Sequence, residues 1–552
     1  MNSNVLFLWP LYFSIVLVSG LLYGKWMANL MSEESPRFED KLLRYLGIDT
    51  TTSMNWKDYL LSVLMFSFVG FIFLQIILMS QQWLPLNPDH KPNVPFLMAF
   101  NITASFVTNT NWQNYGGEST LSHFAQMAGL TVQNFLSAAV GVAVLVALIR
   151  GLIKHDTNKL GNFWSDVTRF TLRILLPLSF VFALFLVHQG VPQTFQANVP
   201  TKTLEGANIQ IPLGPVASQI AIKMNGSNGG GFYNANGAHP YENPTPLTNF
   251  VHLISILLLP IACVFMFIFM LPNHRQGYMI LVVMGIMLGV GILFSYWGEI
   301  QINPITKMHF LEGTETRISL SECSLWSTLT TAVSNGSVNC LHSSLSPVAQ
   351  LIALFNMMTG EVIFGGVGSG LYGMLLYVLL TVFMAGLMVG RTPEYLGKKI
   401  ETKEVIWVGV ALLSPGLMNL LFSALALNLN APLSSLAHVG SHGLSEVIYA
   451  FSSALGNNGS AFAGLNANTI FFNLTTGIGM LLGRFVVIVA SLYIAGSMGI
   501  KKVAVTGPGT LRTDTSIFAF LLWSVIIVVG ALTFFPVLAL GPIAEYLLMN
   551  NF

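Results

Sequence analysis

Charged residues are scarce in this sequence. Asp, Glu, Lys and Arg together make up 9% of the 552 residues, whereas hydrophobic residues make up 53% and the mean hydropathy is +0.67. Because a soluble globular domain carries about 25% charged residues, this chain cannot build a surface that faces water on all sides. The net charge of +1 also argues against nucleic acid as a partner. These absences indicate an integral membrane protein in contact with lipid.

Cysteine is rare, and recognisable catalytic motifs are missing. Cys263, Cys323 and Cys340 are an odd number with no metal-ligand spacing, so we expect packed thiols and no disulfide framework. The sequence has no Asp-Lys-Thr-Gly phosphorylation motif, zinc motif or nucleophile elbow. Residues 390–399 lack the spacing of a phosphate-binding loop, and we interpret them as a basic cytoplasmic loop. We therefore expect no catalytic activity in this chain.

What the sequence does contain is a series of apolar runs. Each has about 20 residues, which is enough to cross a hydrocarbon core of about 30 Å as a helix. No basic segment precedes the first run and no cleavage site follows it, so we expect a retained helix there. The ten runs lie near 4–24, 58–79, 128–150, 170–189, 249–271, 278–297, 372–390, 405–427, 474–498 and 516–541.

Four shorter apolar segments each end in a polar cluster. The segments lie near 96–110, 215–227, 323–335 and 444–457. Segments of this length are typical of re-entrant helices and are too short to cross the membrane. The clusters that end them are rich in Asn, Gly, Ser and Thr and occupy 108–113, 225–231, 334–337 and 456–460.

The four clusters recur at similar intervals. With Asn111, Gly229, Gly336 and Gly459 as equivalents, the spacings are 118, 107 and 123 residues. Each period holds a span, a half-span, a polar loop and a second span, which predicts a pseudo-fourfold arrangement. Four units around one axis keep their non-helical backbone away from lipid. We therefore predict an all-α polytopic membrane protein with ten transmembrane helices, four membrane-pore-membrane repeats, and an extra first and last helix.

Lys and Arg are distributed unevenly between the two sides of the predicted bundle. Eighteen of the 24 fall on the side away from the polar loops, in 25–57, 150–173, 391–403 and 501–512 and at Arg275. Arg484 falls inside a span, and five fall on the loop side: Lys91, Lys202, Lys223, Lys307 and Arg317. By the positive-inside rule, the loops and both termini face outward. We expect the membrane to be a bacterial inner membrane.

The composition of the loops fits a site for a weakly hydrated monovalent cation. A cation that enters the bilayer must exchange its water for oxygen ligands, and rings of backbone carbonyls do this for potassium. Glycine permits close approach of backbones, and Asn, Ser and Thr stabilise turns. The clusters contain no Asp or Glu, which calcium and magnesium sites use. We predict a potassium filter that opens outward, with the potassium ion as transported substrate.

Two further features lie at membrane depth. A glycine-rich stretch interrupts the helix after the third loop and contains Glu361, Gly365, Gly366, Gly368 and Gly370. It is either a flexible gate below the filter that hands the ion sideways, or a site of close packing against a neighbouring helix. Arg484 is a cation within the ninth span and therefore a functional candidate. It either repels cations at the inner end of the pathway or pairs with Glu361.

Several motifs in joint order carry a resemblance to a known family. They include Phe-Val-Thr-Asn-Thr-Asn-Trp-Gln at 106–113, Gly-Gly-Val-Gly-Ser-Gly-Leu-Tyr-Gly at 365–373 and Asn-Asn-Gly-Ser-Ala-Phe-Ala-Gly at 457–464. Further matching stretches lie at 131–137, 214–219, 228–231, 234–236, 242–245, 390–399 and 541–547. Over almost its whole length the chain resembles the potassium-binding A subunits of Kdp-type potassium-transporting ATPases. The weakest stretch is about 300–345, which includes the third loop.

The resemblance implies a fold related to the Trk/Ktr/HKT and potassium-channel superfamily. It also implies a complex with a P-type ATPase subunit that hydrolyses ATP, a third subunit with a single membrane span, and a small peptide subunit. The ion would enter the filter of this chain and pass through a lateral tunnel towards the ATPase subunit. Carried over by motif, the filter consists of Asn109, Thr110, Asn111, Gln113, Ser227, Asn228, Gly229, Ser334, Asn335, Gly336, Asn457, Asn458 and Gly459.

The expected units are an N-terminal helix with a cytoplasmic loop (1–57), four repeats (58–155, 156–274, 275–400 and 401–512) and a C-terminal helix (513–552). The main alternative function is a self-sufficient Trk/Ktr-type potassium transporter driven by the membrane potential. A lipid enzyme would need a catalytic constellation, and a secondary transporter usually has inverted halves and an intramembrane carboxylate site. Neither pattern is present in the sequence.

Overall fold

The structure is a computed structural model that describes residues 3–32, 38–45, 47–50, 52–388, 390–503 and 511–550. Within these residues ten helical segments are long and apolar enough to cross a membrane, which confirms the ten predicted spans. Their helices are α1 (Ser3–Ser32), α3 (Trp56–Ser80), α6 (Val132–Ile153), α7 (Phe163–Phe170) with α8 (Leu176–His188), α10 (Pro246–Met270), α11 (His274–Glu299), α14 (Ser369–Met388), α15 (Thr402–Asn428), α18 (Ile470–Gly499), and α19 (Ser516–Leu538) with α20 (Ala544–Asn550).

The four predicted half-spans are also helices. They are α4 (Phe96–Val107), α9 (Val216–Asn225), α12 (Leu320–Ala332) and α17 (Gly440–Gly456). The other elements are short: α2 (Phe38–Tyr45), α5 (Gly117–Thr120), α13 (Pro347–Met358), α16 (Asn430–Leu433), η1 (Gln81–Trp83), η2 (Ala125–Thr131), η3 (Thr171–Leu175), η4 (Asn236–Ala238), η5 (His342–Ser344), η6 (Ala539–Ile543), and the hairpins β1 (Val199–Lys202) with β2 (Asn208–Ile211) and β3 (Glu394–Tyr395) with β4 (Lys398–Lys399).

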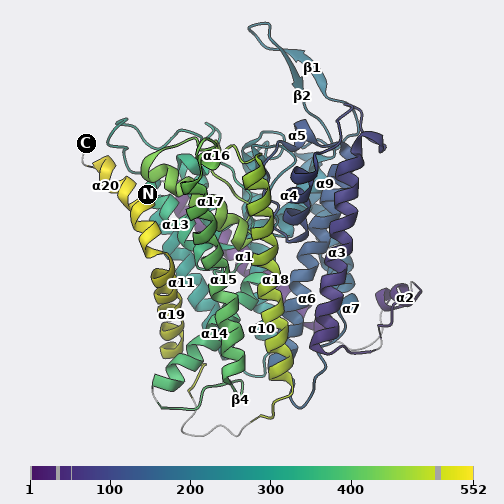
Figure 1. Cartoon of the computed structure of the whole chain (residues 1–552), viewed down its shortest axis with the longest axis vertical. Helices are drawn as coiled ribbons and strands as arrows, with labels where there is room; N and C mark the ends of the chain where they lie inside the picture. Colours follow the sequence, from purple (N-terminus) through teal and green to yellow (C-terminus); the bar gives the residue numbers. More distant parts are fainter. Residues whose placement is uncertain are drawn as a thin grey trace.

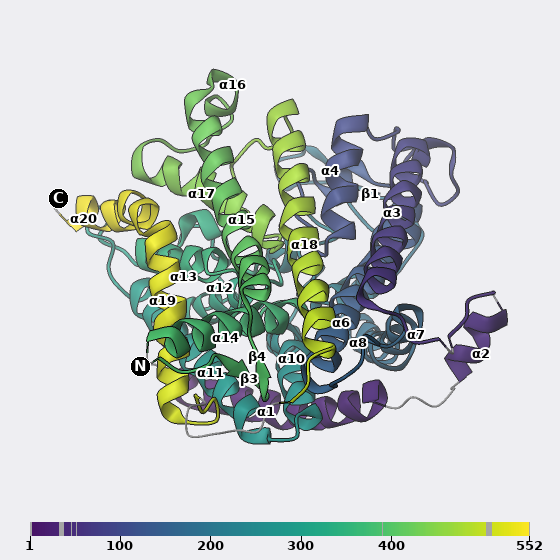
Figure 2. The same ribbon diagram turned by 60° about the horizontal axis from the view of Figure 1, so that its bottom comes forward.

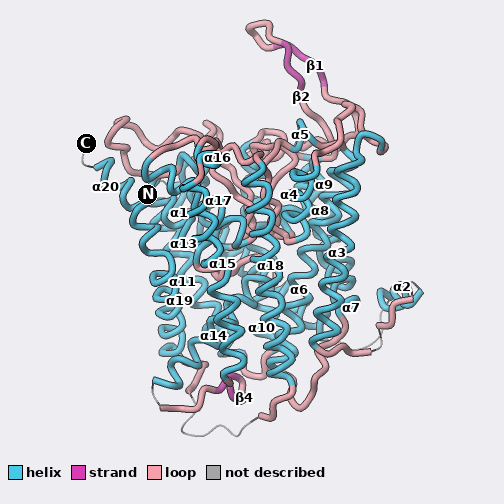
Figure 3. Tube along the Cα trace, viewed as in Figure 1, coloured by secondary structure: helices cyan, strands magenta, loops and turns pink. Residues whose placement is uncertain are grey.

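The long helices run roughly parallel and form one bundle (Figure 1). The half-helices α4, α9 and α17 lie in its upper part, at the end that carries the β1–β2 hairpin, and the β3–β4 hairpin lies at the opposite end. Figure 3 shows loops that descend between the helices from the upper end. Most of α6, α10 and α14 is buried, whereas only 22% of the apolar stretch of α3 and of α15 is buried, and both helices expose large apolar side chains, as lipid contact requires.

Local sequence signals set the ends of several helices. The Asn55 side chain accepts hydrogen bonds from two backbone amides at the start of α3. Thr245 and Thr248 form a capping box on α10, and Ser319 and Glu322 form another on α12. Such caps pair backbone amides that the first helical turn leaves without partners. One of these capping boxes therefore begins the long helix that follows the second polar loop, and the other begins the half-helix that leads to the third.

The first and last long helices lie at the periphery of the bundle (Figure 2). α1 packs along α10, where Tyr12 donates a hydrogen bond to the Leu253 carbonyl at 3.1 Å. A Cβ on Gly24 would overlap Phe265 of α10, so the two backbones approach closely there. α19 packs against α11 and α14. The remaining long helices come in pairs, with one half-helix between the two members of each pair.

The predicted interruption after the third loop is present. α13 ends at Met358, α14 begins at Ser369, and the chain between them is not helical. The prediction of one span near 372–390 recognised only α14, because α13 is too short to cross a membrane on its own.

Two expectations need correction. Cys323 and Cys340 form a disulfide, although we expected packed thiols, and only Cys263 is a free buried thiol. After the third loop the chain returns beside the first turn of α12, so the Cα atoms of the two cysteines lie 5.8 Å apart. Spacing along the sequence does not reveal that return. Lys223, which we assigned to the outer side, is instead buried within α9. Arg37, one of the eighteen basic residues of the other side, lies outside the described residues.

Candidate functional site: a ring of four polar loops

Each half-helix ends in the same way. The residue that follows its last turn has a positive φ in all four cases: 68° at Asn109, 50° at Ser227, 53° at Ser334 and 59° at Asn457. These positions are 118, 107 and 123 residues apart, the same spacings as those of the sequence repeat. The left-handed conformation is a common helix end, and Asn tolerates it well.

A second shared contact fixes the chain that leaves each half-helix. One carbonyl in the last turn accepts the amide five residues later, at 2.8–3.0 Å in all four loops. The pairs are Ser105 with Thr110, Lys223 with Asn228, Thr330 with Asn335, and Ser453 with Asn458. The four loops therefore have equivalent registers, including the third loop, where the resemblance is weakest.

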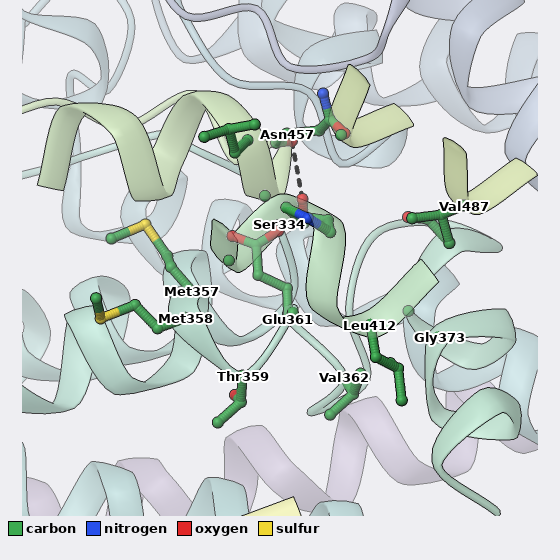
Figure 4. Close-up of a pocket in the computed structure, with 18 of the residues that line it drawn as sticks. Ser334, Met357, Met358, Thr359, Glu361, Val362, Gly373, Leu412, Asn457 and Val487 are labelled. Atoms are coloured by element: carbon green, nitrogen blue, oxygen red, sulfur yellow. Dashed lines mark hydrogen bonds between the residues drawn. The ribbon is translucent and has the colours of Figure 1, made fainter. Parts of the chain in front are cut away.

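Side-chain amides and hydroxyls join the loops to one another. Asn109 donates to the Ser227 carbonyl at 2.9 Å, which links the first loop to the second. Asn335 donates to the Met224 carbonyl at 3.5 Å, which links the third loop to the second. Ser334 donates to the Asn457 carbonyl at 2.9 Å, as Figure 4 shows.

The last link closes the ring. Asn457 donates to the Thr110 hydroxyl at 2.9 Å and joins the fourth loop to the first. Because each loop is bonded to both neighbours, a shift in one loop breaks contacts in two others.

The loops meet at their glycines. A Cβ on Gly336 would lie 2.8 Å from the Cα atoms of both Gly229 and Gly459, and one on Gly229 would lie 2.5 Å from the Thr110 carbonyl oxygen. Real Cβ atoms do not approach other atoms so closely, so a side chain at Gly336 would force the ring apart. The structure thus brings residues from all four loops to one point, although they are more than 340 positions apart in the sequence.

Of the thirteen candidate filter residues, twelve are buried and Gln113 is partly buried. Gln113 and three of the loop glycines line an outer cavity of about 710 Å³ at the mouth of the ring. Glu118 also lines this cavity, and burial raises the pKa of its carboxyl above the usual value. The ring itself presents backbone carbonyls, amide oxygens and hydroxyls, and the loops contribute no carboxylate. The four half-helices direct their C-terminal ends, which carry partial negative charge, at this region.

A second cavity of about 100 Å³ lies on the other side of the loops (Figure 4). Ser334 and Asn457 of the ring line it, together with Glu361, Gly366 and Gly370 of the interruption. In Figure 4 the carboxylate of Glu361 points towards Ser334. Among the described residues, the Glu361 oxygens accept no hydrogen bond of ordinary length.

The other candidates near the interruption have different surroundings. Arg484 lines the inner cavity, and its guanidinium donates to the Ser137 carbonyl of α6 at 3.3 Å. No ion pair joins Arg484 to Glu361 in the described part of the chain. Gly365 and Gly368 do not line the cavity. A Cβ on Gly368 would overlap the backbone of Gly141 in α6, so close packing accounts for this glycine.

Sequence reasoning missed two supports of the ring. One is an ion pair between Lys223 and Glu242, with Nζ 2.9 Å from Oε2. The other is the Cys323–Cys340 disulfide beside the third loop. A single lysine in the last turn of an apolar half-helix was a usable signal for the first, because a charge at membrane depth is rare without a partner. No comparable signal exists for the second.

Comparisons with known proteins agree on one family. A family model described as potassium-transporting ATPase A subunit matches residues 10–547. The chain is 51% identical over 537 residues to a potassium-transporting ATPase potassium-binding subunit of Leptospira interrogans, covering 97% of this chain and 96% of the relative. It is 50% identical over 560 residues to the subunit of the same name in Pseudomonas aeruginosa, with 99% of both chains covered.

The fold also has a solved counterpart. The crystal structure of the potassium transporter TrkH from Vibrio parahaemolyticus matches with a TM-score of 0.50 and 14% sequence identity. The match covers 86% of this chain and 97% of that one. At this identity the likeness concerns the fold, and it confirms the predicted fold class. From the family model and the full-length relatives, this chain belongs to the family of potassium-transporting ATPase A subunits.

Proposed function

We propose that this chain binds potassium ions in the ring of four loops and passes them inward as the channel-like subunit of an ATP-driven uptake complex. One observation carries the proposal. Four half-helices from distant parts of the sequence end at one point, where Gly229, Gly336 and Gly459 are in contact. Oxygen atoms fixed at such a point can replace the water of a potassium ion.

The filter in this proposal consists of the thirteen residues carried over by motif. Their equivalent registers and the hydrogen bonds that join the loops support the assignment. The scarcity of carboxylates favours a monovalent cation over calcium or magnesium. The unit boundaries near 58, 156, 275 and 401 remain part of the same proposal.

The pathway below the filter runs through the inner cavity. Glu361, Gly366 and Gly370 line this cavity beside the filter residues Ser334 and Asn457, which supports a gate at the break between α13 and α14. Arg484 also lines this cavity and would repel a cation there.

ATP hydrolysis is assigned to a partner subunit of P-type ATPase character, with a third, single-span subunit and a small peptide subunit as further partners. The names of the relatives, which describe one potassium-binding subunit of an ATPase, support this division of labour. Family membership favours this function over the alternative of a self-sufficient Trk/Ktr-type transporter.

The outer face of the membrane is assigned to the end of the bundle that carries the ring. Excess Lys and Arg at the other end support this orientation, which places both termini outside a bacterial inner membrane. The Cys323–Cys340 disulfide beside the third loop supports it independently, because disulfides persist in the oxidising periplasm and are rare in the cytosol.

A charge placed in the ring tests the proposal. Gly459→Asp should raise the external potassium concentration for half-maximal uptake at least about tenfold, because its Cβ would overlap the Thr110 carbonyl oxygen and would force the loops apart. The matched control is Gly440→Asp, since Gly440 is the first residue of α17, the half-helix that leads to Gly459, has a φ of 66° and has no atom near its Cβ position. Uptake is measured under potassium limitation at equal amounts of membrane protein. An unchanged half-saturating concentration in Gly459→Asp would contradict the filter.

A further inference from the structure

One position breaks the symmetry of the ring. The carbonyls that accept the loop amides belong to Ser105, Thr330 and Ser453 in three units, and to Lys223 in the second. The three hydroxyl residues are neutral and short. The second unit instead places a primary amine in the last turn of its half-helix, six residues before Gly229. A cation at this place opposes the binding of another cation in the ring.

The Lys223 ammonium is fully enclosed. The side chain is 2% exposed, and Nζ donates to the Glu242 carboxylate at 2.9 Å and to the Asn236 amide oxygen at 2.6 Å. Glu242 is 0% exposed. Each charge would be costly to bury alone, and the pair offsets that cost within the protein.

The carboxylate of this pair also supports the second loop. Glu242 Oε1 accepts the backbone amide of Tyr233 at 2.9 Å, and a Cβ on Gly231 would lie 2.5 Å from the same oxygen. On its other side Gly231 exchanges two hydrogen bonds of 3.0 Å with the side-chain amide of Gln113. The chain directly after Gly229 therefore lies between a residue of the first loop and the buried ion pair.

We propose that the Lys223–Glu242 pair is a positioning element that sets the potassium affinity of the second loop. Glu242 cancels the field of Lys223 at the ring and holds the backbone after Gly229 in place. This inference rests on the proposed function, since it concerns the affinity of that filter. If the pair acts through its charges, an unpaired positive charge should raise the half-saturating potassium concentration and an added negative charge should lower it. A purely structural pair would show no such dependence on sign.

The test measures initial potassium uptake against external potassium in cells that depend on the whole transporter. Glu242→Gln leaves the lysine without its counter-charge and should raise the half-saturating concentration about tenfold, the effect of a unit charge within about 10 Å at an effective dielectric constant of about 20. Asn236→Asp adds a carboxylate beside Nζ and removes neither partner, so it should lower that concentration about threefold. The neutral double variant K223Q E242Q should return to within about threefold of the unmodified protein.

Glu39→Gln is the matched control. Glu39 is also the buried carboxylate of an ion pair, with Arg173 at 2.7 Å, but it belongs to α2, at the end of the bundle away from the ring. The half-saturating potassium concentration of the Glu39→Gln variant should stay unchanged. If Glu242→Gln does not accumulate in the membrane, Asn236→Asp decides the question, because it keeps both charges of the pair.

Two results would overturn the inference. One is a half-saturating concentration that Asn236→Asp leaves unchanged or raises. The other is a double variant that is no better than Glu242→Gln, since only support of the backbone would then matter. The proposed filter fails separately: it falls if Gly459→Asp has no effect. If Gly459→Asp weakens uptake and the charge variants do not, the inference alone is wrong.

Discussion

The ring of loops and the helix break beneath it differ in how hydrogen bonds hold them, although Asn111 Oδ1, Ser227 Oγ and Asn228 Oδ1 of the ring also lack hydrogen-bond partners among the described residues. In the ring, Asn109, Ser334 and Asn457 each donate to a neighbouring loop, so the backbone has one arrangement. In the break, Glu361 faces a cavity, and its oxygens accept no hydrogen bond of ordinary length among the described residues. Loops bonded to one another present oxygen atoms at fixed places, whereas a passage needs space. Under the proposed function, selection belongs to the ring and movement to the break.

The strongest test of the rigid half of this comparison is Gly336→Ala. The added Cβ would overlap the Cα atoms of Gly229 and Gly459, and overpacking of this kind costs about 3 kcal/mol. The potassium concentration for half-maximal uptake should therefore rise about 100-fold. Gly440→Ala, which has a similar φ of 66° and open space around it, should change it little. Equal effects of the two substitutions would show that backbone strain, and not the contact between loops, is responsible.

The break between α13 and α14 is tested by Gly370→Ala. Its Cβ would overlap Gly365 and the Phe364 carbonyl, so the tight turn of the break has no room for a side chain at this position. We expect the maximal uptake rate to fall about tenfold, with the half-saturating concentration changed by less than about threefold. Gly285→Ala in α11, where no atom lies near the added Cβ, is the control. A large change in affinity without a change in rate would reverse the roles assigned to ring and break.

The disulfide sharpens the comparison from the outer side. It ties the first turn of α12 to the chain after the third loop and closes 17 residues, for which removal costs about 3 kcal/mol. The variant C323S C340S should lose thermal stability in detergent. Its half-saturating potassium concentration should rise about threefold. A reducing agent should reproduce both effects in the unmodified protein and should not affect the double variant further. Unchanged stability after reduction would mean that the disulfide does not support the ring.

The smallest expected effect concerns His342 at the same outer edge. Its ring nitrogen is hydrogen-bonded to the Tyr449 hydroxyl at 2.7 Å, and burial lowers its pKa from 6.5 to about 3. The unfolded chain binds the proton at higher pH than the folded one, so this contribution to stability is complete above pH 6.5 and is lost as the pH falls towards 3. Between pH 7 and pH 6 the loss is about 0.7 kcal/mol. Thermal unfolding at the two pH values should show it, and His342→Asn should remove it.

The sequence repeat predicted the membrane architecture well, because each element depends on local features. The ten spans follow from length and hydropathy, and the half-helices end where Asn109, Ser227, Ser334 and Asn457 adopt the left-handed conformation, which Asn tolerates well. The spacing of Gly229, Gly336 and Gly459 even gave the register of loops that differ in sequence.

Contacts between distant segments were not predictable in the same way. The pairing of Cys323 with Cys340 depends on the path of the chain after the third loop. Lys223 is recognisable as a charge in an apolar half-helix, but only the return of Glu242 to α9 identifies its partner. α13 was missed as a helix because the break at Thr359–Gly368 leaves it shorter than a span. The two missed pairings concern three-dimensional neighbours, whose partners no local pattern identifies.

The packing of α1 against α10 has a consequence for biogenesis. Tyr12 reaches a carbonyl 241 residues further along the chain. At a synthesis rate of about 5–20 residues per second, the first helix waits on the order of 10 to 50 s for its partner to leave the ribosome. During that interval the insertion machinery or a lipid must cover Gly20 and Gly24, where the first helix presents backbone instead of side chains. α1 therefore reaches its final place only after the helices between it and α10 have been made.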